Sequence, residues 1–330
     1  MKFEKAKKQF VYQTEQVSEE AVTYFFELAM AQAEYNLAKE NLASSDTLYA
    51  IGERRQQIAA ISQADLLTLR LDRVNARNAL RNSEISLKRA MSALATFLNL
   101  DKDTRIEIDL PVRPRTLSVL ADEALGHARA NNPVYLEQRQ NILEAEREGD
   151  RTKKESHFNA SFNASVGFNQ VADNFRAAYR NPLQQDLVSL SISIPLVDWG
   201  VRKGKYNMAK NNLDVVKIAA RQEEISVEED VVMTVNDFNV QQDLIQSAEE
   251  ALDLAEMAYD QTRRRFIIGK SDINSLTLSL NRQQEAWKNY IGALQNYWLN
   301  YYKIRRLTLH DFEHGCALFD RFDFDKGSYR

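Results

Sequence analysis

A seven-residue repeat of apolar side chains occurs twice in this chain and limits its fold more than any other feature. Such spacing is typical of long helices that pack as coiled coils. The first series is Ala21, Leu28, Tyr35, Leu42 and Tyr49, and the second is Phe238, Ile245, Leu252, Tyr259 and Phe266. Companion rows follow them at Tyr24, Ala31, Ala38 and Ser45, and at Ala248, Ala255 and Thr262. The second series lies 217 positions after the first, which predicts an internal duplication.

Each repeat then meets an Ile-Gly pair, Ile51-Gly52 in the first copy and Ile268-Gly269 in the second. Glycine often ends a helix because it adopts the left-handed conformation readily, so we expect both helices to turn back there. The following segments DLLTLRLDR and NSLTLSLNR match at an offset of 209, so the first turn should be eight residues longer. The returning helices should reach about Leu100 and about Leu309, which makes each copy an antiparallel helical hairpin with an arm on the order of 90 Å.

Composition supports long helices and excludes several classes of protein. Only 10 Gly and 5 Pro occur in 330 residues, which does not suit a loop-rich β fold. The net charge of −4, with both signs interspersed, argues against a nucleic-acid partner. Even the most apolar helical stretch, AVTYFFELAM, is interrupted by Glu27, and the first residues lack the apolar core of a signal peptide. The lone Cys316 is compatible with any redox compartment.

Residues 158–168 alternate strictly between apolar and polar side chains, the period of a β-strand with two unlike faces. Apart from Gly167, its alternate positions are Asn or Ser, and the polar positions of a second strand, VSLSISIPL, are Ser. Strands with an apolar outer face and a polar inner face are typical of outer-membrane barrels. The residues that would face lipid are Phe158, Phe162, Val166, Phe168, Val188, Leu190, Ile192 and Ile194, and Trp199 would lie near the membrane interface. The alternative is a hairpin that packs this face on helices.

Five regions follow from these patterns. We expect a first helical hairpin at 1–110, a connector with short helices around the Asn131-Asn132-Pro133 turn at 111–157, and a strand hairpin at 158–197. A second helical hairpin should occupy 198–312, and a tail should occupy 313–330.

The duplicated hairpins, NNPVY before a strand, and SISIPLVDWGVRKGK between a strand and a long helix resemble the TolC family of outer-membrane efflux proteins. The resemblance implies a mainly α fold with a β-hairpin, in which a homotrimer joins long helical coiled-coil hairpins to a shared outer-membrane β-barrel. It also implies a channel component of a tripartite efflux or type I secretion system, located in the outer membrane and periplasm. Its partners would be a periplasmic adaptor and an inner-membrane transporter, and its transport would be passive, without cofactors or enzymatic chemistry.

That family has a strand pair before each helical hairpin and a leader before the first. This chain opens inside the first long helix, so we expect an N-terminally truncated sequence, which leaves open whether this polypeptide closes a barrel by itself.

The resemblance also suggests two sets of functional residues. The adaptor would dock at the helical tips, on Ile51, Gly52 and Glu53 and on Ile268, Gly269 and Lys270. The tunnel would narrow at Asp272, with Ser275 at the second position that is acidic in the family and Asp65 as a rough counterpart after the first tip. A ring of carboxylates in a narrow pore could bind cations. The alternative for both aspartates is a helix N-cap.

Two other classes of protein remain as alternatives. One is a soluble coiled-coil adaptor or scaffold without channel activity. The other rests on His310-Asp311-Phe312-Glu313-His314, which matches the H-x-x-E-H spacing of a zinc hydrolase. Because no third ligand follows at helical spacing, a solvated chain end is favoured over a metal site, and no catalytic residues are assigned.

Overall fold

The computed structural model describes residues 2–101, 104–110, 114, 116–155, 159–169, 183–194, 197–323 and 328–329. These residues form two compact units. One comprises residues 134–226, and the other comprises residues 2–133 together with 227–330. The bounds of the long helices are α1 (Lys2–Gln57), α2 (Gln63–Phe97), α5 (Val201–Ile267) and α6 (Ile273–Thr308).

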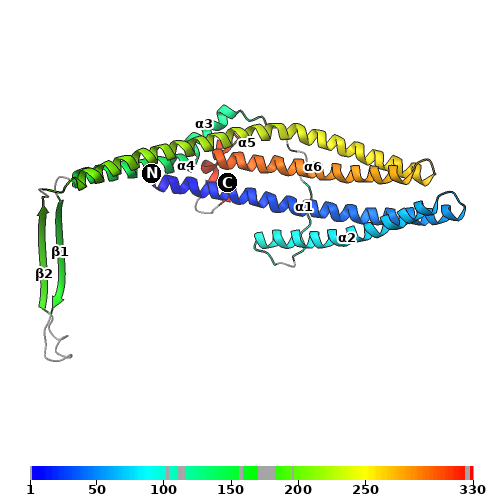
Figure 1. Ribbon diagram of the computed structural model, residues 1–330, viewed down its shortest axis with the longest axis horizontal. Helices are drawn as coiled ribbons and strands as arrows, with labels where there is room; N and C mark the ends of the chain where they lie inside the picture. Colours follow the sequence, from blue (N-terminus) through cyan, green and yellow to red (C-terminus); the bar gives the residue numbers. More distant parts are fainter. Residues whose placement is uncertain are drawn as a thin grey trace, which may run out of the picture. The chain divides into compact units, whose positions relative to one another are not determined.

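The larger unit is built on two antiparallel helical hairpins, α1–α2 and α5–α6, as the sequence predicts. Figure 1 shows α1 (blue) beside α2 (cyan) and α6 (orange), and both neighbours contact it. Helix α5 packs on α6 through Phe238 and Tyr297, whose ring centroids are 4.9 Å apart. The heptad residues form the buried seam, with Leu28 and Phe238 fully buried. The expected coiled-coil packing is therefore confirmed.

An extended connector crosses this unit between α2 and the next helix, α3 (Ala121–Asn131), and side-chain amides from two long helices hold it. Gln32 of α1 pairs with the backbone of Ile108, donating at 2.7 Å and accepting at 3.1 Å. Gln242 of α5 pairs in the same way with Leu117, at 2.6 and 2.9 Å, and Asn239 pairs with Val119. These amides replace the strand partners that an extended backbone otherwise lacks, so the connector is fixed to both hairpins.

The end of α6 is enclosed by other parts of the chain. Asn131 and Asn132 donate side-chain hydrogen bonds to the carbonyl oxygens of Thr308 and Leu307, two of the unpaired acceptors at this helix terminus. Helix α4 (Pro133–Glu155) starts directly afterwards with a proline at its first position, where no backbone N–H is needed.

Much of the C-terminal segment is buried, so the expectation of a solvated end is wrong. It comprises β3 (His310–Asp311), β4 (Cys316–Ala317), α7 (Leu318–Arg321), β5 (Phe322–Asp323) and β6 (Ser328–Tyr329). Leu309, Leu318 and Phe322 form a core with Val11 near the other end of the chain. A partner more than 290 residues away leaves no local signal in the sequence, which explains the error.

The smaller unit contains most of α4, the first part of α5 and two antiparallel strands, β1 (Asn159–Asn169) and β2 (Leu183–Ser193). An ion pair of 3.6 Å joins Lys217 of α5 to Glu146 of α4. Asp198 starts α5 by accepting a hydrogen bond from the backbone N–H of Arg202 at 2.8 Å. Within the described parts of the chain, no helix has both the length and the apolar character needed to cross a membrane.

Candidate functional site

The tip of the second hairpin has the predicted geometry. Helix α5 ends at Ile267, and Gly269 follows with φ +78°. The N–H of Gly269 bonds to the carbonyl of Phe266 at 3.0 Å, and that of Lys270 bonds to the carbonyl of Arg265 at 2.8 Å. This pattern satisfies the last carbonyls of the helix. Ile268, at the turn, is 65% exposed.

The first tip is not at Ile51-Gly52, and that prediction is wrong. Both residues and Glu53 lie inside α1, which continues to Gln57. Gly52 is buried in contact with α2: a Cβ there would come within 2.5 Å of a methyl carbon of Leu69. The glycine at this position therefore allows α1 and α2 to approach closely, and it does not end the helix.

The actual first turn occupies residues 58–62, between α1 and α2, and matches residues 268–272 in length. The expected eight-residue difference is therefore also wrong. Ile58 is 75% exposed and corresponds to Ile268, and Ala59 takes the left-handed conformation, with φ +56°, that Gly269 takes in the second tip. Sequence reasoning missed Ile58, because alanine at the following position gives no signal for a helix end.

Both tips restart a helix with the same pair of side chains in opposite order. In the first tip, the Ser62 hydroxyl accepts from the N–H of Asp65 at 3.1 Å, and the Asp65 carboxylate accepts from the N–H of Ser62 at 3.0 Å. In the second, the Asp272 carboxylate accepts from the N–H and the hydroxyl of Ser275 at 2.7 and 2.9 Å. The constriction candidates Asp65, Asp272 and Ser275 are thus N-cap residues or their partners.

These hydrogen bonds favour the charged form of both aspartates. The hydroxyl and N–H of Ser62 lower the pKa of Asp65, and the N–H and hydroxyl of Ser275 lower the pKa of Asp272. The two exposed tips therefore carry fixed negative charge at neutral pH.

The two tips share one apolar core. Leu48 of α1, Leu69 of α2, Phe266 of α5, and Ile273 and Leu276 of α6 are buried together. Arg55 of α1 reaches the other hairpin and donates from Nη2 to the carbonyl oxygen of Ile267 at 3.0 Å. The hairpins are thus joined at their ends as well as along their length.

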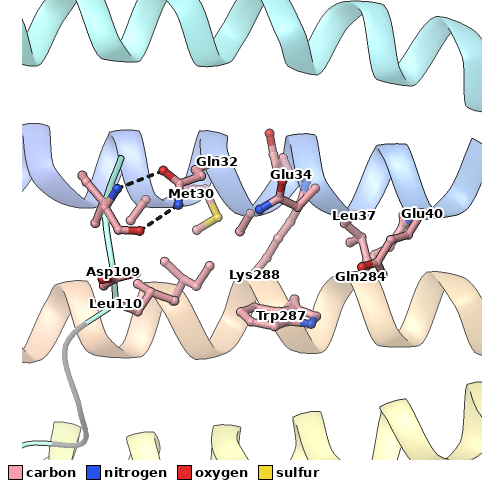
Figure 2. A pocket seen from close by; sticks show the side chains of 15 residues that line it. Met30, Gln32, Glu34, Leu37, Glu40, Asp109, Leu110, Gln284, Trp287 and Lys288 are labelled. Atoms are coloured by element: carbon pink, nitrogen blue, oxygen red, sulfur yellow. Dashed lines mark hydrogen bonds and ion pairs between the residues drawn. The ribbon is translucent and has the colours of Figure 1, made fainter. Parts of the chain in front are cut away.

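A cavity of about 240 Å³ lies farther from the tips, between α1, α6 and the connector. Figure 2 shows Met30 and Leu37 of α1, Leu110 of the connector and Trp287 of α6 around this space. Lys288 spans it to form a 2.9 Å ion pair with Glu34, while Trp287 donates from Nε1 to Glu256 at 3.0 Å. The cavity is mainly apolar, and its wall is fixed by the Gln32–Ile108 pairing.

The strand pair has two chemically different faces. Its register places Ala160 opposite Ile192, Phe162 opposite Leu190 and Ala164 opposite Val188, which makes an apolar face. The other face pairs Ser161 with Ser191 and Asn163 with Ser189. The candidate lipid-facing side chains described here are between 63% and 72% exposed: Phe162, Val166, Phe168, Val188, Leu190, Ile192 and Ile194. The remaining candidate, Phe158, lies outside the described residues.

The apolar face does not extend along the whole of β2. Toward the end near Leu183, Asp186 lies opposite Val166 and Gln184 opposite Phe168, so polar groups join this face. Near the other end of the ribbon, Trp199 follows β2 in a left-handed conformation and is 95% exposed.

The H-x-x-E-H histidines contact different partners. His310 stacks on His127, whereas the Nδ1 of His314 is 3.0 Å from a carboxylate oxygen of Asp311. In the described part of the chain, no group of three or more His, Cys, Asp or Glu side chains is placed to hold a metal ion.

Paired long helical hairpins with a two-faced strand ribbon are the architecture expected of an outer-membrane efflux protein. The family model for outer membrane efflux proteins matches residues 124–308, more than half of the chain, so the chain belongs to that family. The resemblance to TolC-like proteins is thereby confirmed.

Solved structures share the fold at low sequence identity. The outer-membrane channel OprN matches with a TM-score of 0.74 and 17% identity, covering 94% of this chain and 69% of its own. The Campylobacter jejuni outer membrane channel CmeC matches with a TM-score of 0.74 and 12% identity, covering 94% of this chain and 67% of its own. The Vibrio cholerae outer membrane protein VceC matches with a TM-score of 0.70 and 14% identity, covering 92% of this chain and 72% of its own. Comparison with curated proteins gave no significant match.

Proposed function

We propose that this protein is the outer-membrane channel component of an efflux system and that three copies enclose one conduit. The strands would contribute to a shared barrel in the outer membrane, and the helical hairpins would form a tunnel in the periplasm. Transport through it would be passive. The same architecture would serve a tripartite efflux pump or a type I secretion system.

The strand ribbon is the observation that carries this proposal. Its apolar face is exposed along β1 and over residues 188–194, whereas its other face presents serine and asparagine. In a bilayer, backbone polar groups at open strand edges are costly, so such a ribbon is stable there only when it closes with other strands. Two strands are too few for a barrel, which favours sharing among identical subunits.

The tips are the proposed docking sites for a periplasmic adaptor, which would connect the channel to an inner-membrane transporter. Ile268, Gly269 and Lys270 form the exposed turn of the second tip, and Ile58 takes the corresponding position in the first. Ile51, Gly52 and Glu53 belong to the helix before that turn, so the proposed contact moves to residue 58.

The same tips would form the narrow end of the tunnel. In a trimer, three copies of Asp272 would place three carboxylates around the axis, with three copies of Asp65 nearby. Their lowered pKa values keep them charged at neutral pH. Negative charge in a narrow pore attracts cations because screening is poor there. We therefore propose a cation-selective constriction.

Planar-bilayer recording of the full-length protein tests the proposal. Stepwise conductance with cation selectivity is expected. Asp272→Asn should reduce the selectivity, whereas Ser275→Ala, which keeps the carboxylate and removes only a cap partner, should retain it. A full-length protein that stays dispersed without detergent and never conducts would instead support a coiled-coil scaffold. Equal selectivity of both variants would refute the role of Asp272.

A further inference from the structure

Two imidazole rings stack where α3 meets the end of α6. The ring centroids of His127 on α3 and His310 on β3 are 3.7 Å apart, and the ring planes differ by 9°. His310 is only 7% exposed. The edge of Phe312 packs against both rings, with centroid distances of 5.9 Å to His127 and 5.0 Å to His310.

Uncharged side chains also hold this joint, beside the ion pair between Arg129 and Glu228. The amides of Asn131 and Asn132, one turn after His127, donate to the carbonyls of Thr308 and Leu307 at 3.3 and 2.8 Å. These bonds do not change with pH in the neutral to mildly acidic range. Histidine is the residue type whose charge changes in that range. His127 and His310 lie in the joint itself, and His314 lies beside it in contact with Asp311.

Two carboxylates lie near the stack. A carboxylate oxygen of Glu123 is 3.9 Å from Nε2 of His127. Asp311, next to His310, is already shared between Arg305 at 3.7 Å and His314 at 3.0 Å. Two protonated rings in face-to-face contact would repel each other strongly, because water screens them poorly at this buried site.

Burial, and then the nearby charge of His127, lowers the pKa of His310, while Glu123 and Asp311 oppose this effect. Because the two rings are in contact, a positive charge on one ring disfavours a positive charge on the other. A state in which they separate binds more protons than the stacked state. The stacking contribution is complete above the ordinary histidine pKa of about 6.5 and is lost as pH falls through the lowered value.

We propose that the His127–His310 stack is an acid-released latch that holds α3 on the end of α6 at neutral pH and separates when both rings are protonated. The latch would control how firmly the connector region, which leads into α3, is held against the second hairpin. This role is independent of channel conductance.

Hydrogen exchange measured by mass spectrometry on the full-length protein tests the latch. After correction for intrinsic rates, residues 121–131 and 307–312 should lose protection severalfold between pH ~7.5 and ~5.5, because separation of the stack opens their backbone hydrogen bonds. Residues 76–95 of α2 should not change. His127→Phe/His310→Phe keeps two flat rings without a titrating group and should abolish the acid response, while the exposed His314→Gln should retain it.

Histidine-selective NMR of the unsubstituted protein supplies a second readout that needs no variant. His310 should titrate below the ordinary histidine value of about 6.5. The latch is refuted if acid leaves protection of both segments unchanged, if His127→Phe/His310→Phe still shows the response, or if His310 titrates at or above that ordinary value.

Discussion

Arg55 of α1 donates a hydrogen bond to the carbonyl oxygen of Ile267, the last residue of α5, at 3.0 Å. Its guanidinium group also lies over the ring of Phe266, 5.6 Å from the centroid. A side chain of the first hairpin thus caps the long helix of the second, which joins the two tips into one unit.

Arg55→Met should loosen the second tip while keeping most of the side-chain volume. We expect the free energy of local unfolding at this tip to fall by about 1 kcal/mol, the usual contribution of one such hydrogen bond. Faster hydrogen exchange in residues 265–272 measures it. Arg54→Met, at the exposed neighbouring position, should have little effect, and equal effects of both substitutions would contradict the capping role.

Gly269→Ala should destabilise the second tip. Gly269 has φ +78°, and an added Cβ would come within 2.8 Å of Nη2 of Arg55. The left-handed conformation alone costs a residue with a Cβ roughly 1–2 kcal/mol. Gly292→Ala is the matched control, because its Cβ would meet nothing within 4 Å inside α6. The control substitution should raise the free energy of unfolding by up to about 1 kcal/mol. Changes of the same sign in the free energy of unfolding of both variants would contradict these conformations.

Glu15→Ala should strongly destabilise the larger unit. Glu15 is fully buried and accepts two hydrogen bonds from Arg305, both at 3.0 Å. Removing one partner of a buried ion pair costs about 3–5 kcal/mol, and we expect the lower end of this range because Arg305 keeps Asp311 at 3.7 Å. Glu84→Ala, which breaks an exposed pair with Lys88, should cost no more than about 0.5 kcal/mol. Chemical denaturation of both variants provides the measurement, and similar midpoints would exclude a structural role for the buried pair.

Tyr297 and Tyr301 should ionise only at strongly alkaline pH. Burial raises the pKa of each to about 12. Because the folded state holds the phenolic proton more tightly than the unfolded chain, this stabilisation is complete below pH ~10 and is lost as pH rises through the folded pKa. Ultraviolet titration should show a late-ionising group of tyrosines, and Tyr297→Phe/Tyr301→Phe should reduce the absorbance change of that group. Titration of every tyrosine near pH 10 would contradict their burial.

The structure could be predicted from the sequence where the pattern of side chains is local and periodic. The heptad rows became the buried seam around Leu28 and Phe238, and alternation predicted the two-faced strands. The first tip was missed because a seven-residue repeat matches itself at more than one offset. The second series fits the first at 217 positions, but the turns themselves align Ile58 with Ile268, 210 positions apart, which preserves the heptad register.

Contacts between distant parts of the chain could not be predicted from single residues. Val11 packs on Phe322, and His127 stacks on His310, although neither pair has a sequence signature. The cap Ser62-x-x-Asp65 could have been found, since serine three residues before an acidic residue is typical of a helix start. That signal locates the first tip correctly.

The most direct test concerns the two faces of β2. In the full-length protein with Cys316→Ser, reconstituted in lipid bilayers, cysteine would be placed at Ser191 or at the adjacent Ile192, which lie on opposite faces of the ribbon. A charged, water-soluble thiol reagent should react with the cysteine at 191 and reduce conductance, while the cysteine at 192 should react slowly. A fluorophore attached to the cysteine at 192 before reconstitution should be quenched by brominated lipid. Equal reaction at both positions, or lipid contact at 191 instead of 192, would contradict a ribbon with its apolar face toward lipid and its serine face toward a water-filled passage.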